Sequence, residues 1–445
     1  MEAAMSVDLS IDFAPEILED GTVEECATFG KLTIETRHAM LTEGFDYHLK
    51  GSRTGPLVSA YYLAEWFAWN WWRLRWEPRR NGSDWDFAHK MNNIGEGYVW
   101  PNITIFSDGV RTALISGASE NPEAKPFRYF GANPVMMPST SYEGAVDKFI
   151  GQVLSRLQDR GIADSNLGRL WKDLLAERSD TEISQRRRIE AMLGREPDEI
   201  EDDKIEQLVS DAKQLGANAV EEVAAHQGRI GSVGVDIISA ADFVASAKSD
   251  GFDVAIKDAV RLGSDCQLPN KLHVHAWQLG AAAAKALRDQ ERLGSGLISD
   301  KRLAEMAGTQ AAAVTNGIKA DIKMPFLLDQ DKELSRIVLS ARRLEGCRFN
   351  LARLLGDNLL NREGALHPAT RASTYRQKAQ RAFAAELLSP FEAVEDMMQG
   401  DYSDDMQEEV AGHFSVSPMT INTLLKNHGR IERDDPEQYV EVAAA

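Results

Sequence analysis

The sequence is poor in the features that mark secreted and membrane proteins. It has only three cysteines in 445 residues, and none of them lies in a CxxC pair. An odd number of widely spaced thiols is typical of a protein in a reducing cytosol. The N-terminus has no basic segment followed by an apolar one, and the longest apolar run, Tyr61–Trp72, is interrupted by polar residues. That run is too short to cross a bilayer, so we expect a soluble, cytoplasmic protein without membrane contact.

Basic residues are also outnumbered by acidic ones: the chain has 50 Lys and Arg against 69 Asp and Glu, so its net charge is −19. Such a chain is repelled on average by phosphate backbones, so any nucleic-acid contact requires a local basic surface. The sequence has no P-loop, GxSxG motif or dinucleotide-binding fingerprint. Hydrophobic residues make up 43% of the chain, with nine Trp and sixteen Phe. This content is enough for well-packed cores and argues against a largely disordered chain.

Hydrophobic periodicity predicts an α+β fold that is mostly helical. Residues 1–142 read as a mixed α/β domain, with a buried helix near Tyr61–Leu74 and a hairpin of roughly alternating strands around Asp108-Gly109. Residues 143–270 read as a helical region with linkers. Residues 271–432 are predicted to form a third, helix-rich domain, and residues 433–445 an acidic tail.

Two segments of the third domain carry a family resemblance. RFNLARLLGDNLL (348–360) resembles the helix of ImmA/IrrE metallopeptidases that is usually written RFxLAHELGH. AQRAFAAELLSP (379–390), with the helix pair after it, is similar to the family's EANxFAAELLMP segment. The similarity covers about residues 271–431, in the same order, and implies a zincin-like domain with a helix-turn-helix-like end.

The resemblance also shows what this chain lacks. In HExxH, two imidazoles on one helical face bind zinc and the Glu between them activates the bound water. The two His positions carry Arg353 and Asp357, the Glu position carries Leu354, and the third ligand position carries Ala379. A guanidinium does not coordinate zinc, so the sequence predicts a pseudo-peptidase with no catalytic residue, metal or cofactor.

Two interpretations of this remodelled pocket remain open. Arg353 and Asp357 are four residues apart, so they can form a helix-surface ion pair worth about 0.2–0.5 kcal/mol, with Arg381 as a neighbour. In the other interpretation, Arg353 binds a peptide terminus or a small anion.

A displaced metal site is an alternative. His273 and His275 would share one face of a strand and could chelate a metal, with His367 or Asp357 as further ligands. The chain would then be an active metallopeptidase that cleaves a repressor. Two ordinary histidines at a domain edge are the simpler interpretation.

Residues 408–424 fit a helix-turn-helix pattern. Ala411, Ile421 and Leu424 occupy the packing positions, and Ser417-Pro418 suit the start of the second helix. The outward residues are predicted to be Met419, Thr420, Asn422, Thr423 and Lys426. They could contact DNA or a protein partner, although the preceding helix is acidic; packing within the domain is the alternative.

Seven of the nine tryptophans lie between residues 66 and 100, beside Arg73, Arg75, Arg79 and Arg80. Interleaved aromatic and basic residues can bind a nucleic acid or a partner, which makes Arg73 and Arg75 candidate surface residues. They are equally compatible with a core helix whose arginines cover ring faces. Taken with the family resemblance, the sequence predicts a protein-binding regulator, sensor or defence component of bacterial stress, mobile-element or phage responses.

Overall fold

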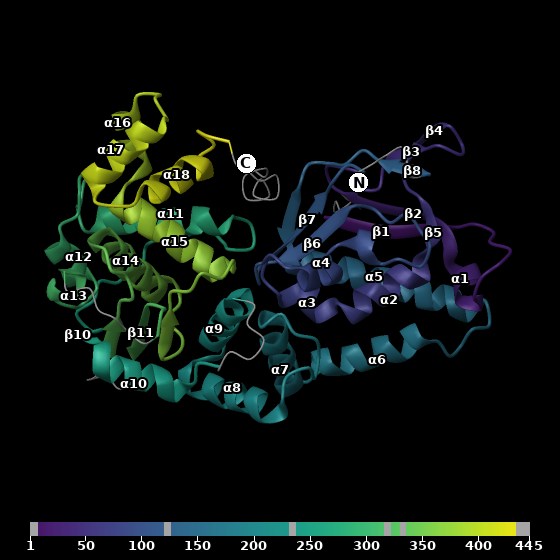
Figure 1. Cartoon of the computed structure of the whole chain (residues 1–445), viewed down its shortest axis with the longest axis horizontal. Coiled ribbons are helices and arrows are strands. Elements are labelled where there is room, and N and C mark those ends of the chain that lie inside the picture. The colour runs from purple at the N-terminus through teal and green to yellow at the C-terminus, as the bar shows by residue number, and fades with distance from the viewer. Residues whose placement is uncertain (1–7, 120–125, 231–236, 316–321, 330–334, 433–445) are drawn as a thin grey trace. The chain divides into compact units, whose positions relative to one another are not determined.

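The computed structural model describes residues 8–119, 126–230, 237–315, 322–329 and 335–432, and the predicted tail at 433–445 lies outside these ranges (Figure 1). The chain divides into two compact units: unit 1 ends at Pro197 and unit 2 runs from Asp198 to Asp434. The boundary falls inside the 143–270 segment, so the predicted helical region is shared between the units. The α+β class with a majority of helix is confirmed.

The described part of unit 1 contains three small antiparallel sheets, and helices pack on the two of them that include β1 and β6. The sheets are β1-β2-β5, β4-β3-β8 and β6-β7-β9. Their strands are β1 (Leu9–Pro15), β2 (Phe29–Thr36), β3 (Gly44–Asp46), β4 (Gly51–Arg53), β5 (Leu57–Ser59), β6 (Ile103–Ser107), β7 (Arg111–Ser116), β8 (Phe127–Tyr129) and β9 (Val135–Pro138). The helices are α1 (Val23–Thr28), α2 (Ala60–Trp69), α3 (Trp71–Trp76), α4 (Ser83–His89), α5 (Ser139–Asp159), α6 (Asn166–Ser179) and α7 (Thr181–Met192), with a short 3₁₀ turn at Met91–Asn93.

The predicted hairpin is confirmed, but its alternation of buried and exposed residues is not. β6 and β7 pair antiparallel around Asp108, whose Oδ1 accepts hydrogen bonds from the N–H groups of Val110 and Arg111. Every residue of both strands is buried. One face packs on the main core of unit 1 and the other on Trp85 of α4. A sheet covered on both faces has no solvent side that would require polar residues.

The helix predicted at 61–74 is divided into α2 and α3. Asn70 leaves helical geometry at φ −95° and ψ 8°, and its Nδ2 donates to the Trp66 carbonyl oxygen at 2.9 Å. A side chain that bonds the carbonyl four residues back competes with the helical backbone bond. Trp66, Trp71 and Trp72 are buried, whereas Trp69 is 60% exposed.

Unit 2 packs its helices around a four-stranded antiparallel sheet, in the order β10-β12-β11-β13. Its strands are β10 (Phe252–Val254), β11 (Phe326–Asp329), β12 (Ser335–Val338) and β13 (Leu366–Pro368). Its helices are α8 (Asp202–Leu215), α9 (Ala217–Ile230), α10 (Ala240–Asp250), α11 (Ala276–Gln290), α12 (Asp300–Met306), α13 (Ala312–Thr315), α14 (Leu344–Leu360), α15 (Tyr375–Leu388), α16 (Phe391–Met398), α17 (Asp404–Phe414) and α18 (Pro418–Asn427).

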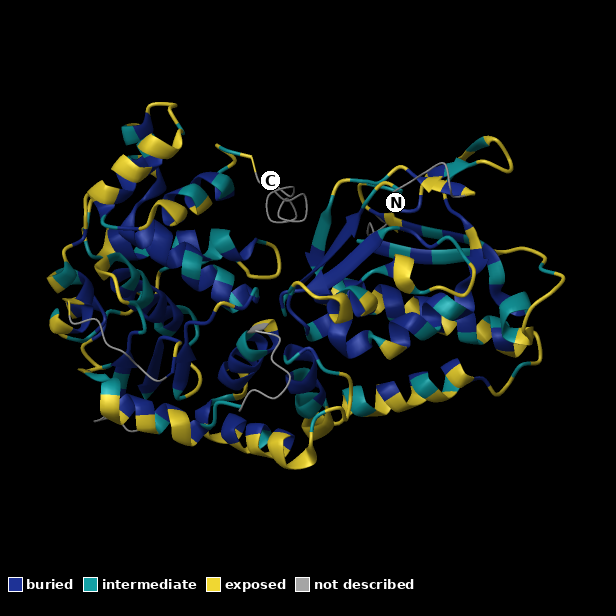
Figure 2. Ribbon diagram, in the orientation of Figure 1, coloured by how far each residue is buried: buried dark blue, intermediate teal, exposed yellow. Residues whose placement is uncertain are grey.

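Two kinds of helix are distinguished by burial. Exposed residues follow one side of α6 and α8, as expected for amphipathic surface helices (Figure 2). In contrast, most residues of α14 and α15 are buried, including the charged residues Arg348, Arg353, Asp357 and Glu386. None of the helices in the described ranges is long and apolar enough to cross a membrane.

Candidate functional site

The segments with the family resemblance form two adjacent helices, α14 and α15. They pack closely where Gly356 of α14 meets Phe383 of α15: a Cβ at Gly356 would lie 2.4 Å from Cδ1 of that ring. The predicted pocket residues Arg353 and Asp357 lie on α14 and are 6% and 0% exposed. The site is therefore a buried polar cluster within a helix pair and not a surface ion pair.

Asp357 lies at the centre of the cluster. Arg376 of α15 donates to both of its carboxylate oxygens, from Nε at 2.8 Å and from Nη2 at 2.5 Å. His367 Nδ1 lies 3.0 Å from Oδ2, and Asn361 Nδ2 donates to Oδ1 at 2.9 Å. Burial alone would raise the pKa of the Asp357 carboxyl, but Arg376 and His367 hold it well below its usual range. Asp357 is thus an ionised carboxylate whose neutralising cation is a guanidinium.

Arg353 has a different set of partners. Its Nη2 donates to the Thr370 carbonyl oxygen at 2.6 Å and to the amide oxygens of Gln377 and Gln380 at 2.7 and 3.3 Å. Its Nε is buried without a hydrogen-bond partner. Burial and the charge of Arg381 lower the pKa of Arg353 to about 9. The expected ion pair between Arg353 and Asp357 is therefore wrong, because other helices and strands supply the partners of each residue.

The other two predicted pocket residues lie on α15. Arg381 donates from both Nη1 and Nη2 to the Ala372 carbonyl oxygen at 3.1 Å, so it faces the loop before α15. Ala379 is buried, and its carbonyl oxygen lies where α11 crosses: a Cβ at Gly280 would lie 2.2 Å from that oxygen. This close contact identifies the Ala379 turn as a packing point between α11 and α15.

Glu222 of α9 belongs to the same cluster and was not predicted. It accepts a hydrogen bond from Thr374 Oγ1 at 2.6 Å, and burial raises its pKa to about 7. Nearby His226 is kept neutral, because burial and the charges of Arg371 and Arg229 lower its pKa to about 4. Because α9 and α14 are far apart in the sequence, no short-range residue pattern could have predicted these contacts.

Of the four candidate metal ligands, only His367 and Asp357 are brought together in the parts of the chain that the structure describes. His275 is the N-cap of α11 and is buried, and His273 lies exposed in the preceding turn. The expected strand that would align the two is wrong. His367 is on β13 beside Asp357. Within the described ranges, no group of three or more His, Cys, Asp or Glu residues has the arrangement of a metal site.

The segment predicted to be helix-turn-helix-like forms two helices, α17 and α18. Ala411, Ile421 and Leu424 are buried as predicted. Thr420 is also buried, so its prediction as an outward residue is wrong; its hydroxyl is used in a 2.9 Å bond with that of Ser417, the N-cap.

The other predicted contact residues of this segment differ in exposure. Asn422 Nδ2 donates to Gln407 of α17 at 3.0 Å, and Lys426 is half-buried. The exposed face of α18 contains Met419 and Thr423. A helix that presents these two residues has little of the basic character that phosphate contact requires.

Arg73 and Arg75 do not form the predicted exposed surface, because they are 5% and 8% exposed. Arg75 lies over the ring of Trp76 at 3.8 Å and pairs with Glu143. Arg73 donates from Nε to Glu77 at 2.7 Å. The alternative interpretation as a core helix with arginines against ring faces is the correct one.

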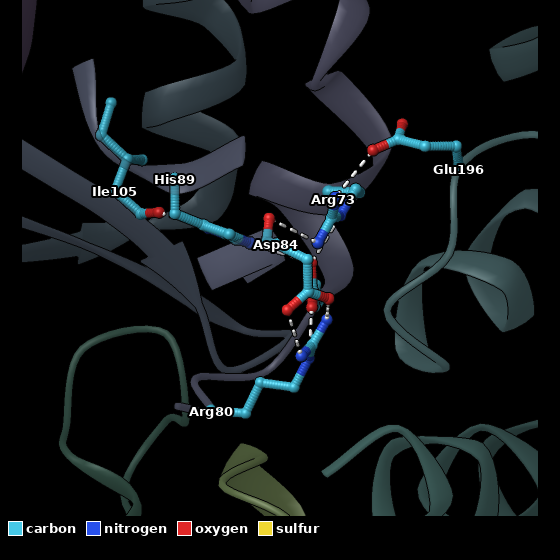
Figure 3. A network of polar contacts seen from close by, with 7 residues as sticks. Arg73, Arg80, Asp84, His89, Ile105 and Glu196 are labelled. Atoms are coloured by element: carbon cyan, nitrogen blue, oxygen red, sulfur yellow. Dashed lines mark hydrogen bonds and ion pairs between the residues drawn. The ribbon is translucent and has the colours of Figure 1, made fainter. Parts of the chain in front are cut away.

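Figure 3 shows the network that buries Arg73. Its centre is Glu77, which also accepts from Arg80 Nε at 2.8 Å and lies 3.0 Å from His89 Nε2. His89 Nδ1 lies 2.6 Å from the Ile105 carbonyl oxygen. Burial would raise the pKa of Glu77, but His89 and Arg73 lower it to about 2. The network is an internal connection between α3, α4 and β6.

Arg353 Nε is one of several buried donors without a partner in the described ranges; Arg348 Nε in unit 2 and Arg188 Nε in unit 1 are others. Comparison of the chain with models of known families, with curated proteins and with solved structures finds no match.

Proposed function

We propose that the chain acts by recognising a protein partner, with unit 2 serving as a peptidase-like scaffold that does not cleave. The family resemblance suggests a cytoplasmic regulator, sensor or defence component in bacterial stress, mobile-element or phage responses. The observation that carries the proposal is the bidentate bond from Arg376 to Asp357. Asp357 lies on the helix that resembles the zinc-binding helix, and both of its oxygens already accept hydrogen bonds from the Arg376 guanidinium where a metal would need a free carboxylate.

Chemistry supports the same conclusion. Water activation by zinc requires several neutral imidazole or carboxylate ligands around one open position. In this cluster, Arg376, His367 and Asn361 already use the oxygens of Asp357. Adding a divalent cation beside Arg353 and Arg376 would also bring like charges together in a buried site. An active peptidase would require a rearrangement of both α14 and α15.

Metal analysis of the purified full-length chain tests the proposal. After incubation with excess zinc and dialysis, we expect far less than one zinc per chain by plasma mass spectrometry. The Asp357→Asn variant is the matched control, because it removes the one carboxylate of α14 at the site while leaving adventitious surface binding unchanged. Stoichiometric zinc in the unmodified protein that is absent from Asp357→Asn would overturn the proposal.

A cleavage assay addresses the activity directly. The substrate is a repressor encoded beside this chain, mixed with it in the presence of zinc or of a chelator. We expect a complex on size-exclusion chromatography and intact repressor under both conditions. Chelator-sensitive cleavage would favour the displaced-metal alternative instead.

A further inference from the structure

Three successive carbonyl groups before α15, those of residues 370–372, each accept a hydrogen bond from an arginine of a different helix. Arg353 of α14 donates to the first at 2.6 Å, and Arg229 of α9 donates to the second at 2.6 Å. Arg381 of α15 donates to the third at 3.1 Å. The loop therefore gathers three guanidinium groups that lie far apart in the sequence.

The carboxyl groups of Asp357 and Glu222 do not balance this positive charge. The loop contributes a fourth guanidinium from the exposed side chain of Arg371. Asp357 is neutralised by its bidentate partner Arg376. The pKa of buried Glu222, raised to about 7, leaves that group only partly ionised at neutral pH. In a chain with a net charge of −19, the loop is a local basic centre.

Arg353 is a buried member of this group, and one of its donors has no partner within the described ranges. It is 6% exposed, and all of its hydrogen bonds to the described residues come from Nη2. Its Nε is buried and has no partner. A buried donor without an acceptor is costly. The bonds from Nη2 hold Arg353 against the loop and α15, but they leave its Nε without an acceptor among the described residues.

We infer that Arg353, Arg371 and Arg381 form a binding site for the carboxylate of an acidic peptide. The inference rests on the proposed recognition function and names the chemistry of the partner. Arg371 provides the exposed contact, and Arg353 provides the buried donor at the base of the site. Carboxylate oxygens accept the short, charge-assisted hydrogen bonds that guanidinium groups donate. Free inorganic phosphate has oxygens of the same type, so the test separates the two sources.

Fluorescence polarisation with a labelled hexaglutamate peptide measures the binding of the full-length chain at low salt. We expect Arg371→Ala to weaken binding by about tenfold and Arg353→Met by about a hundredfold, since charge-assisted hydrogen bonds contribute in this range. Arg160→Ala is the matched control, because Arg160 is an exposed arginine of unit 1 and the charge change is the same. Its affinity should remain within about twofold of the unmodified protein.

Several outcomes would overturn the inference. The inference is wrong if the unmodified chain does not bind hexaglutamate or binds a hexaglutamine peptide equally well. It is also wrong if the chain binds inorganic phosphate but not hexaglutamate. An equal loss in Arg160→Ala would also contradict it. If Arg353→Met fails to fold, Arg371→Ala still decides the question, because its side chain is exposed. Failed peptide binding by a zinc-free chain overturns this inference alone, whereas stoichiometric zinc overturns the proposed function.

Discussion

Arg376 and Asp357 form a bidentate ion pair in the interior of unit 2, with the carboxylate of Asp357 fully buried. The two residues come from neighbouring helices, α15 and α14, so the pair joins the segments that carry the family resemblance. A buried pair of this kind contributes little compared with apolar residues of the same shape, but breaking it is costly.

Replacing Arg376 by Met should therefore destabilise unit 2 by about 3–5 kcal/mol, because Asp357 would remain as an uncompensated buried charge. The double variant Arg376→Met with Asp357→Leu should recover most of this loss. Urea unfolding can be followed at Trp277, the single tryptophan of unit 2, by fluorine NMR of 5-fluorotryptophan-labelled protein. Equal stability of the single and double variants would show that the loss does not come from the unpaired charge of Asp357.

Glu222 should make unit 2 less stable as the pH rises. Its folded pKa of about 7 lies above its ordinary value of 4.5, so the folded state binds more protons between these values. The cost of ionisation is absent below about pH 4.5, grows through this window and is complete above pH 7. Glu222→Gln should thus stabilise the protein by on the order of 3 kcal/mol at pH 8 and have little effect near pH 4.5. Urea midpoints at the two pH values measure the difference; a gain of the same size at both would contradict the pKa assignment.

Glu77 should have the opposite pH dependence in unit 1. Its folded pKa of about 2 lies below its ordinary value of 4.5, because His89 and Arg73 stabilise the carboxylate. Its contribution is complete above pH 4.5 and is lost as the pH falls toward 2. Glu77→Gln should lower stability by on the order of 3 kcal/mol at pH 7 and by much less at pH 2.5. Tryptophan fluorescence follows this unfolding, since eight of the nine tryptophans lie in unit 1.

Gly280 should be intolerant of any side chain. A Cβ there would lie 2.2 Å from the backbone oxygen of Ala379, so Gly280→Ala must separate α11 from α15. We expect a loss of about 1–3 kcal/mol from this overpacking. Gly412→Ala is the matched control: it lies in α17 with nothing within 4 Å of its Cβ, and should gain up to about 1 kcal/mol from helix propensity. Thermal melts of the two variants should move in opposite directions.

The sequence anticipated the elements of secondary structure well, because these depend on local spacing. Ser417 was recognised as the N-cap residue of α18, and its side chain accepts a hydrogen bond from the backbone of that helix. The hairpin at Asp108 was equally local. There are two exceptions. The expected helix at 61–74 is divided at Asn70, whose side chain bonds the Trp66 carbonyl oxygen, and the expected strand at His273 and His275 is a turn followed by a helix.

The hydrogen-bond and ion-pair partners of the charged residues could not be predicted from local spacing. Spacing placed Asp357 four residues from Arg353, but its guanidinium partner Arg376 lies nineteen positions away on another helix. Arg73 was expected on a surface and is instead surrounded by the carboxylates of Glu77 and Glu196. A charged residue looks the same in a sequence whether it is solvated or buried.

The sequence by itself determined where most of the helices form, and through the family resemblance it predicted that the residues at the expected zinc positions do not hold a metal. Only the tertiary structure decided which charges neutralise one another and that Arg353 keeps a buried donor without an acceptor. The physical reason is that helix formation depends on hydrogen bonds and side-chain contacts between residues three or four positions apart in the sequence. Burial, and the electrostatic energies that follow from it, depend on which distant helices pack together.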